Sequence, residues 1–169
     1  MHYANNRLIE VTKEIDLGQI RKEVADAPLE TSLTLRFDHQ GGLLRAGIDT
    51  HQALTRRAGD SVGIITGQIN SAATLIYLGC KKRMIAENGS IAFHYPYWTV
   101  SMEIYENPAL MEQNRRSAIK ILDSIYQIFY TTSGMHRKKL RKLMHERTTL
   151  SAQEAVRAGL ADCIYTEAP

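Results

Sequence analysis

The chain has 169 residues, of which 44% are hydrophobic and 23% charged. At about 100–200 residues per domain this length predicts a single globular domain over residues 1–169 and argues against a two-domain enzyme. Its 21 basic and 18 acidic residues leave a formal charge of only +3. This bias is too weak to indicate a nucleic-acid partner, so we expect none.

The cysteines and the apolar segments predict the cellular compartment. Cys80 and Cys163 have no CxxC spacing, so we expect two small buried thiols in a reduced protein, with no metal site and no cofactor. The N-terminal segment lacks the features of a signal peptide, and the apolar stretch over residues 72–80 is too short to cross a bilayer. We therefore expect a cytoplasmic protein with no membrane partner.

Hydrophobic periodicity in the first half of the chain predicts strands that alternate with helices. A glycine turn, DHQGG, separates the second strand from the second helix, and we expect Gly59 to end that helix in a left-handed conformation. The sequence GQIN after the third strand reads as a turn. The predicted elements are strands at residues 7–11, 32–37 and 61–66, with helices at 16–27, 43–58 and 71–80.

The second half of the chain predicts two short strands followed mainly by helices. An irregular aromatic stretch over residues 95–107 precedes a long helix with apolar residues at helical spacing. The predicted elements are strands at 83–86, 90–94 and 162–165, with helices at 109–132, 135–146 and 151–159. This order predicts an α/β fold with a largely parallel sheet and a C-terminal helical extension.

Three turns after strands carry residues that suit chemistry, because open α/β sheets bind ligands beyond the carboxyl ends of their strands. Ser71 begins a buried helix, where N–H groups favour a developing oxyanion, although a plain N-cap explains it as well. Gly42 has no side chain to block its N–H, and DHQGGLL matches no phosphate-loop pattern. His94 ends an apolar strand, where a lone histidine is usually structural.

These three residues together have another interpretation. A hydroxyl at a helix start, an imidazole at a strand end and a free glycine N–H are the nucleophile, general base and oxyanion donor that acyl transfer requires. His51, in contrast, falls within the apolar stripe of its helix, so we expect a core histidine there.

Three blocks of sequence resemble the Clp protease proteolytic subunits, in that family's order. GQINSAATLIYLGCKKRMIAENGSIAFHYP resembles the segment in which a serine after Gly-Gln-x-x is followed by a buried helix and then by a strand ending in the catalytic histidine. DHQGGLLRAG resembles the family's Asn-Ser-Pro-Gly-Gly turn, and TLSAQEAVRAGLAD resembles its Leu-Ser-Ala block. The resemblance covers residues 37–164 and implies the α/β Clp/crotonase-type ββα superhelix with a long C-terminal handle-like helix.

The resemblance implies a serine endopeptidase that cleaves peptides or unfolded protein. It makes Ser71 the nucleophile and His94 its base, with the N–H groups of Gly42 and Ala72 as the oxyanion hole. It also implies a ring homo-oligomer, with the long helix packed between subunits or rings, and an AAA+ unfoldase as a possible partner.

One catalytic position departs from the family's pattern. Arg147 stands where the family has its catalytic aspartate, and a cation there cannot stabilise an imidazolium. The candidate for the third catalytic residue is Glu146, the adjacent carboxylate, and Asp123 is a more distant candidate. The alternative, which we favour, is that a backbone carbonyl or water holds His94. Two other functions therefore stay open: a catalytically weak Clp-like scaffold or regulatory subunit, and a crotonase-type enzyme acting on acyl-coenzyme A.

Overall fold

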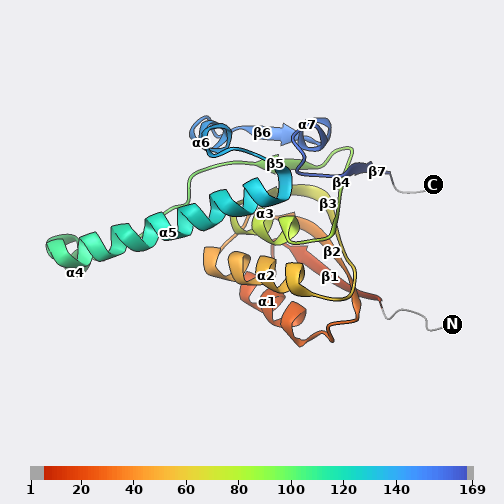
Figure 1. Cartoon of the computed structure of the whole chain (residues 1–169), viewed down its shortest axis with the longest axis horizontal. Helices are drawn as coiled ribbons and strands as arrows, with labels where there is room; N and C mark the ends of the chain where they lie inside the picture. The colour runs from red at the N-terminus through yellow and green to blue at the C-terminus, as the bar shows by residue number, and fades with distance from the viewer. Residues whose placement is uncertain (1–5, 167–169) are drawn as a thin grey trace.

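The structure is a computed structural model that describes residues 6–166 (Figure 1). Seven strands and seven helices are present in this part of the chain. In chain order they are β1 (Asn6–Thr12), α1 (Leu17–Asp26), β2 (Ser32–His39), α2 (Leu44–Arg56), β3 (Ser61–Asn70), α3 (Ser71–Leu78), β4 (Lys82–Ala86), β5 (Ser90–Ala92), α4 (Met102–Glu106), α5 (Pro108–Ser133), α6 (Arg137–His145), β6 (Thr149–Ser151), α7 (Ala152–Arg157) and β7 (Cys163–Tyr165).

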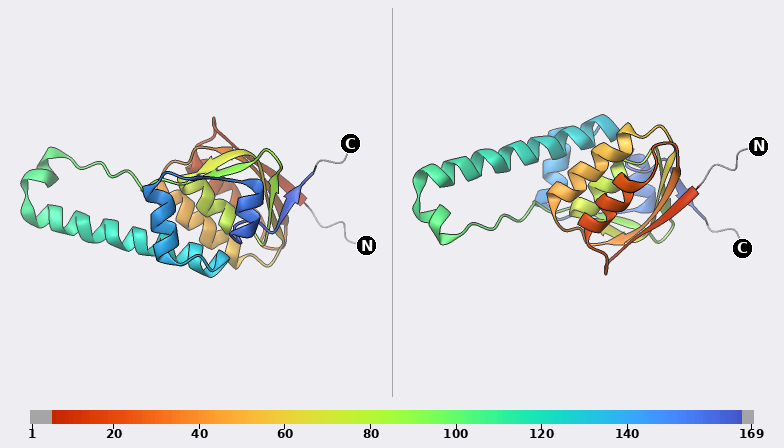
Figure 2. Two further views of the ribbon diagram at one scale, coloured as in Figure 1. Left: turned by 90° about the horizontal axis from the view of Figure 1, so that it is seen from above. Right: turned by 90° about the horizontal axis from the view of Figure 1, so that it is seen from below.

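A parallel sheet in the order β1-β2-β3-β4-β7 forms the centre of the fold. In β2, Leu33, Leu35 and Phe37 are fully buried and alternate with partly exposed residues, so one face of the strand meets the core. Helices α1, α2 and α3 cover that face (Figures 1 and 2). The α/β fold class and the largely parallel sheet predicted from the sequence are confirmed.

β3 is longer than predicted, because GQIN continues the strand instead of forming a turn. Between the pairs Phe37–Ile65 and His39–Ile69, β2 has one intervening residue and β3 has three, so β3 carries a bulge. The Asp38 carboxylate accepts a hydrogen bond from the Gln68 N–H at 3.2 Å and holds this bulge. Beyond it, β3 leaves β4 and pairs with β5. The bulge therefore directs the end of β3, and Ser71 after it, toward the strand that leads to His94.

Helix α5 forms a handle that extends beyond the rest of the molecule, with α4 at its outer end (Figures 1 and 2). It starts at Pro108, where Asn107 caps two N–H groups, and ends at Gly134 with φ 70°. Its buried residues, from Ile125 to Phe129, all lie in the half of the helix next to the core. The predicted long helix is confirmed, whereas α4 lies inside a stretch predicted to be irregular.

The end of α2 corrects another prediction. The helix ends at Arg56, and Gly59 does not adopt a left-handed conformation. Arg57 turns inward instead: the residue is 4% exposed and its guanidinium donates hydrogen bonds to the carbonyls of residues 24, 27, 28 and 31. The reason for a glycine is space, since a Cβ at Gly59 would lie 2.6 Å from the Thr31 carbonyl oxygen.

A short strand and an exposed cysteine differ from what the sequence predicts. The short strand β6 was not predicted, and it pairs antiparallel with β5. Cys163 is exposed, contrary to the expectation of two buried thiols, whereas Cys80 is buried and burial raises the pKa of its thiol to about 12. Within residues 6–166, no helix is both long and apolar enough to cross a membrane.

Candidate active site

Ser71 lies at a strained junction between β3 and α3. Asn70 is fully extended at φ −150°, and Ser71 then takes φ 53°, a left-handed conformation that is rare for residues other than glycine. A serine on a sharp strand-to-helix turn is the geometry of a nucleophile elbow, which exposes the hydroxyl above the sheet. Helix α3, which begins at Ser71, is buried along its length, so its packing holds the turn at Ser71 in place.

The glycine turn after β2 packs directly against this elbow. Gly41 has φ 96°, and a Cβ there would lie 2.6 Å from Ser71 Cβ and 2.9 Å from the Asn70 carbonyl oxygen. Asn70 Nδ2 also donates to Gln40 Oε1 at 2.9 Å. Gly41 was singled out in the sequence only as one of a pair, yet it is the glycine that the close approach requires.

Two backbone N–H groups near Ser71 are free to donate to a ligand. Gly42 is exposed, and among residues 6–166 its N–H donates to no other group. Ala72 is the second residue of α3, where an N–H has no acceptor within the helix. Both residues therefore have the free donors that the sequence analysis required of an oxyanion hole.

His94 is brought to Ser71 by the pairing of β3 with β5. Asn70 pairs with Ala92, so Ser71 and His94 follow the ends of neighbouring parallel strands. Nδ1 of His94 lies 2.6 Å from the Tyr95 carbonyl oxygen. Because a carbonyl only accepts, Nδ1 carries the proton, and Nε2 of the neutral ring is left as an acceptor. The ring stacks on Tyr97 with centroids 5.1 Å apart.

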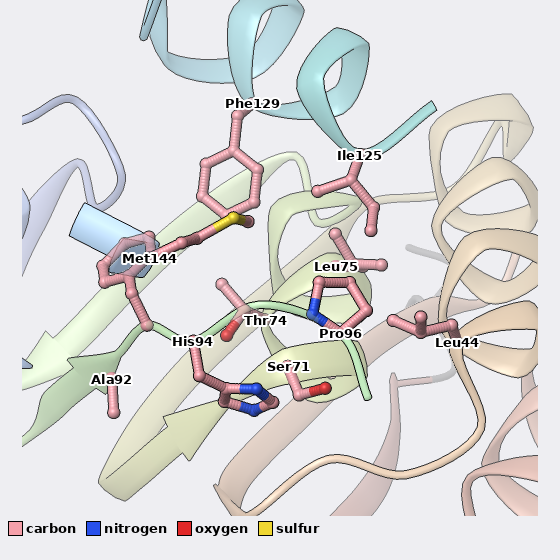
Figure 3. A pocket seen from close by; sticks show the side chains of 11 residues that line it. Leu44, Ser71, Thr74, Leu75, Ala92, His94, Pro96, Ile125, Phe129 and Met144 are labelled. Carbon is pink, nitrogen blue, oxygen red and sulfur yellow. The ribbon is translucent and has the colours of Figure 1, made fainter. Parts of the chain in front are cut away.

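Ser71 and His94 line two adjoining hollows. The first lies over the glycine turn, and its other lining residues are Gln40, Gly41, Gly42, Leu44, Pro96 and Tyr97. The second is mainly apolar, with Leu44, Thr74, Leu75, Ala92, Phe93, Pro96, Ile125, Phe129 and Met144 (Figure 3). Helix α5 thus contributes to the wall of the second hollow.

Thr74 is the buried polar group in that apolar wall. The residue is 3% exposed, and its hydroxyl has no hydrogen-bond partner among residues 6–166. A buried hydroxyl without a partner costs about 1–3 kcal/mol.

Arg147 lies two residues before β6, beyond the end of its pairing with β5. The Phe93 N–H donates to the Thr148 carbonyl at 2.9 Å, which continues the antiparallel pairing of β5 with β6. The pairing stops there, because the Thr148 N–H donates to the Leu143 carbonyl at 3.0 Å and the Arg147 N–H donates to the Met144 carbonyl at 3.3 Å. Arg147 is exposed and has φ 50°, so the chain turns sharply at this position.

The two carboxylates considered for the third catalytic role have other contacts. Glu146 lies 3.8 Å from Lys142 Nζ, and Asp123 lies 3.1 Å from Arg137 Nη1. Within the described chain, neither residue lines the two hollows at Ser71. The observed partner of His94 Nδ1 is the Tyr95 carbonyl.

His51 is confirmed as a core histidine, 8% exposed, and its Nδ1 lies 3.1 Å from the Leu75 carbonyl oxygen. Burial lowers the pKa of His51, because the charged imidazolium loses its hydration. In the described part of the chain, no group of three or more His, Cys, Asp or Glu side chains converges where a metal ion could bind.

Comparison with known proteins agrees with this architecture. A ClpP1 mutant from Listeria monocytogenes has a similar structure, with a TM-score of 0.77, and the match covers 95% of this chain and 92% of that one. At 20% identity this likeness shows the ClpP fold. The family model for Clp protease matches residues 7–168. The chain belongs to the Clp protease family, which supports a ClpP-like peptidase.

Proposed function

We propose that the chain is a serine endopeptidase that cleaves peptides or unfolded protein through Ser71 and His94. The observation that carries the proposal is the meeting of three features in one hollow: the strained serine, the histidine with Nε2 left free, and the glycine turn. The family's catalytic use of a serine and a histidine at these sequence positions supports the assignment.

In the proposed reaction, Ser71 Oγ attacks the substrate carbonyl carbon while His94 Nε2 takes the hydroxyl proton. The N–H groups of Gly42 and Ala72 stabilise the oxyanion, and such donors are each worth about 10²–10³ in rate. His94 then gives the proton to the departing amine, which leaves an acyl group on Ser71. Water, activated by the same histidine, releases the acid product and restores the hydroxyl.

The Ser71 side chain must turn for the first step. Figure 3 shows its oxygen on the side of Cβ that faces away from the His94 ring. Rotation about χ1 to another staggered position is the ordinary way for a serine to change direction, and catalytic hydrogen bonds often tighten only when substrate binds. We infer that substrate binding selects the rotamer in which Oγ donates to Nε2.

The apolar hollow is the natural place for the substrate side chain before the cleaved bond. Leu75, Ile125, Phe129 and Met144 favour an apolar group there. The unpartnered hydroxyl of Thr74 adds a hydrogen-bonding requirement, because a substrate group that reaches it removes the cost of a buried free hydroxyl. We therefore expect efficient cleavage after a side chain that is mainly apolar and carries one hydrogen-bonding group.

A fluorophosphonate probe tests the central assignment. The wild-type chain should label at Ser71, while Ser71→Ala should not label and His94→Ala should label far more slowly. An ordinary N-cap serine has neither a base nor an oxyanion hole, so it does not react. A folded wild-type chain that stays unlabelled contradicts the proposal.

That negative result favours the second candidate, a catalytically weak Clp-like scaffold. The observation behind it is Arg147 at the sequence position of the family's catalytic aspartate, because a cation near His94 opposes the imidazolium that forms during proton transfer. A scaffold should assemble normally and show no peptide hydrolysis that depends on Ser71.

We further propose a ring homo-oligomer that an AAA+ unfoldase supplies with unfolded protein. The family resemblance supports this assembly, and so does the handle, which carries exposed apolar side chains far from the core. These side chains are Met102, Tyr105 and Ile119. Sedimentation at micromolar concentration should show a large assembly, and a monomer contradicts the proposal.

A further inference from the structure

A buried histidine lies beneath the glycine turn and is outside the reaction described above. His39 is the last residue of β2 and is 6% exposed. Its Nε2 lies 2.9 Å from the Ile15 carbonyl oxygen, and the Gly41 N–H donates to its Nδ1 at 2.9 Å. The ring thus joins the loop before α1 to the turn that packs on Ser71.

These two partners determine the chemical state of the ring. A backbone N–H only donates, so Nδ1 must be unprotonated, and a carbonyl only accepts, so Nε2 must carry the hydrogen. His39 is therefore held as the neutral tautomer with the proton on Nε2. Any other state breaks one of the two contacts and leaves a partly buried backbone group without its partner.

The contact with Gly41 has a direct consequence for the oxyanion hole. Gly41 is fixed on one side by His39 Nδ1 and on the other by Ser71 Cβ and the Asn70 carbonyl, which leave no room for a side chain. The next peptide unit carries the Gly42 N–H. With Gly41 held at φ 96°, the direction of that N–H is restricted as well.

We propose that His39 is a positioning residue that holds the glycine turn so that the Gly42 N–H points at the developing oxyanion. The inference rests on the proposed function of Ser71. The contact between His39 and Gly41 is a hydrogen bond from the backbone N–H of residue i+2 to a side-chain acceptor on residue i, the same connection that an Asx turn makes. A side chain with an acceptor at that place should therefore replace the histidine.

Two substitutions test the two hydrogen bonds of His39 separately, because each variant keeps one of them and loses the other. In His39→Asn, the side-chain oxygen lies where Nδ1 was, so the Gly41 contact survives and the Ile15 contact is lost. In His39→Gln, the amide nitrogen reaches the Nε2 position, so the Ile15 contact survives and the Gly41 contact is lost. The pair has similar chemistry and differs in which contact it keeps.

The test measures kcat and KM of the wild type and both variants with a short fluorogenic peptide. We expect His39→Gln to lower kcat about 10- to 100-fold with KM nearly unchanged, because oxyanion stabilisation acts in the transition state. His39→Asn should restore kcat to within a few-fold of the wild type. A merely structural role predicts instead that both variants lose activity in proportion to their loss of stability.

Hydrogen exchange of the Gly41 amide gives a readout that does not need turnover. It should be slow in the wild type and in His39→Asn, and fast in His39→Gln, while amides of the core strands stay protected in all three. Wild-type kcat in His39→Gln, or a fast Gly41 amide in the wild type, overturns the inference alone. A wild-type chain without Ser71-dependent turnover overturns the proposed function and, with it, the catalytic role of His39.

Discussion

Replacing Arg147 by aspartate should increase the rate of peptide hydrolysis. This residue holds the sequence position of the family's catalytic aspartate and lies next to Thr148, whose carbonyl accepts from the Phe93 N–H, so we expect its side chain near the His94 ring. A carboxylate within about 4 Å of the ring stabilises the imidazolium formed in the transition state. Aspartate also tolerates the left-handed backbone, at φ 50°, better than most residues.

The size of the effect follows from Coulomb's law and exposure. Two unit charges 4 Å apart interact by about 1 kcal/mol in bulk water and about 4 kcal/mol near a protein surface. Because Arg147 is exposed, solvent screening keeps the gain at the low end, about 1–2 kcal/mol. At about 1.36 kcal/mol per tenfold change, kcat should rise about 5- to 30-fold.

The assay is steady-state hydrolysis of a fluorogenic peptide at low and high salt, with Arg147→Asn as the matched control. Asparagine removes the cation and has the same shape as aspartate, but brings no negative charge. We expect the asparagine variant to gain much less than the aspartate variant, and the difference to shrink as salt rises. Equal rates in the two variants, or a slower aspartate variant, refute the placement of Arg147 beside His94.

Three other predictions concern the surroundings of the site. Gly41→Ala should abolish peptide hydrolysis, because a Cβ there lies 2.6 Å from Ser71 Cβ. Gly134→Ala is the control: Gly134 also has a positive φ, but a Cβ there meets no atom within 4 Å. Denaturant unfolding should show a loss of about 1–2 kcal/mol of stability for Gly134→Ala, and kinetics should show unchanged activity. Because the pKa of His51 is lowered in the folded state, the unfolded state takes up a proton first as the pH falls below 6.5. The free energy of unfolding should therefore be greatest above pH 6.5 and fall below it. His51→Asn should reduce the difference between the unfolding midpoints at about pH 5.5 and about pH 7.5, and an unchanged difference contradicts this prediction. The wild type should prefer a hydrogen-bonding substrate side chain over an apolar one of the same size by about tenfold in kcat/KM, and Thr74→Val should remove this preference. If the preference is the same in both proteins, the Thr74 hydroxyl has no role in specificity.

The sequence predicted the elements whose signals are local. The helix beginning at Ser71 and the long helix ending before Gly134 both follow from apolar spacing and terminal residues, and both are present. Strand β6 has only three residues, over Thr149–Ser151, and its pairing with β5 depends on chain that is more than fifty residues away. Nothing in such a short stretch indicates a partner so distant.

The same limit applies to the site. Helix-start and strand-end positions were enough to select Ser71 and His94, but the spacing of GQIN gave no sign of the bulge that brings their strands together. The acceptor for the His94 Nδ1 proton is a main-chain carbonyl, which every residue carries. For that reason the sequence could name carboxylates as candidates, but could only suggest a carbonyl in general terms.

Helix α5 connects the tip of the handle to the wall of the apolar hollow. Its 26 residues give a rod about 39 Å long, and only the inner half is clamped by the core, through Ile125 and Phe129, which are also walls of the apolar hollow. A sideways push on the free outer turns produces a torque that the inner turns must balance. The residues that fix the handle to the core are thus the same residues that shape the hollow beside Ser71.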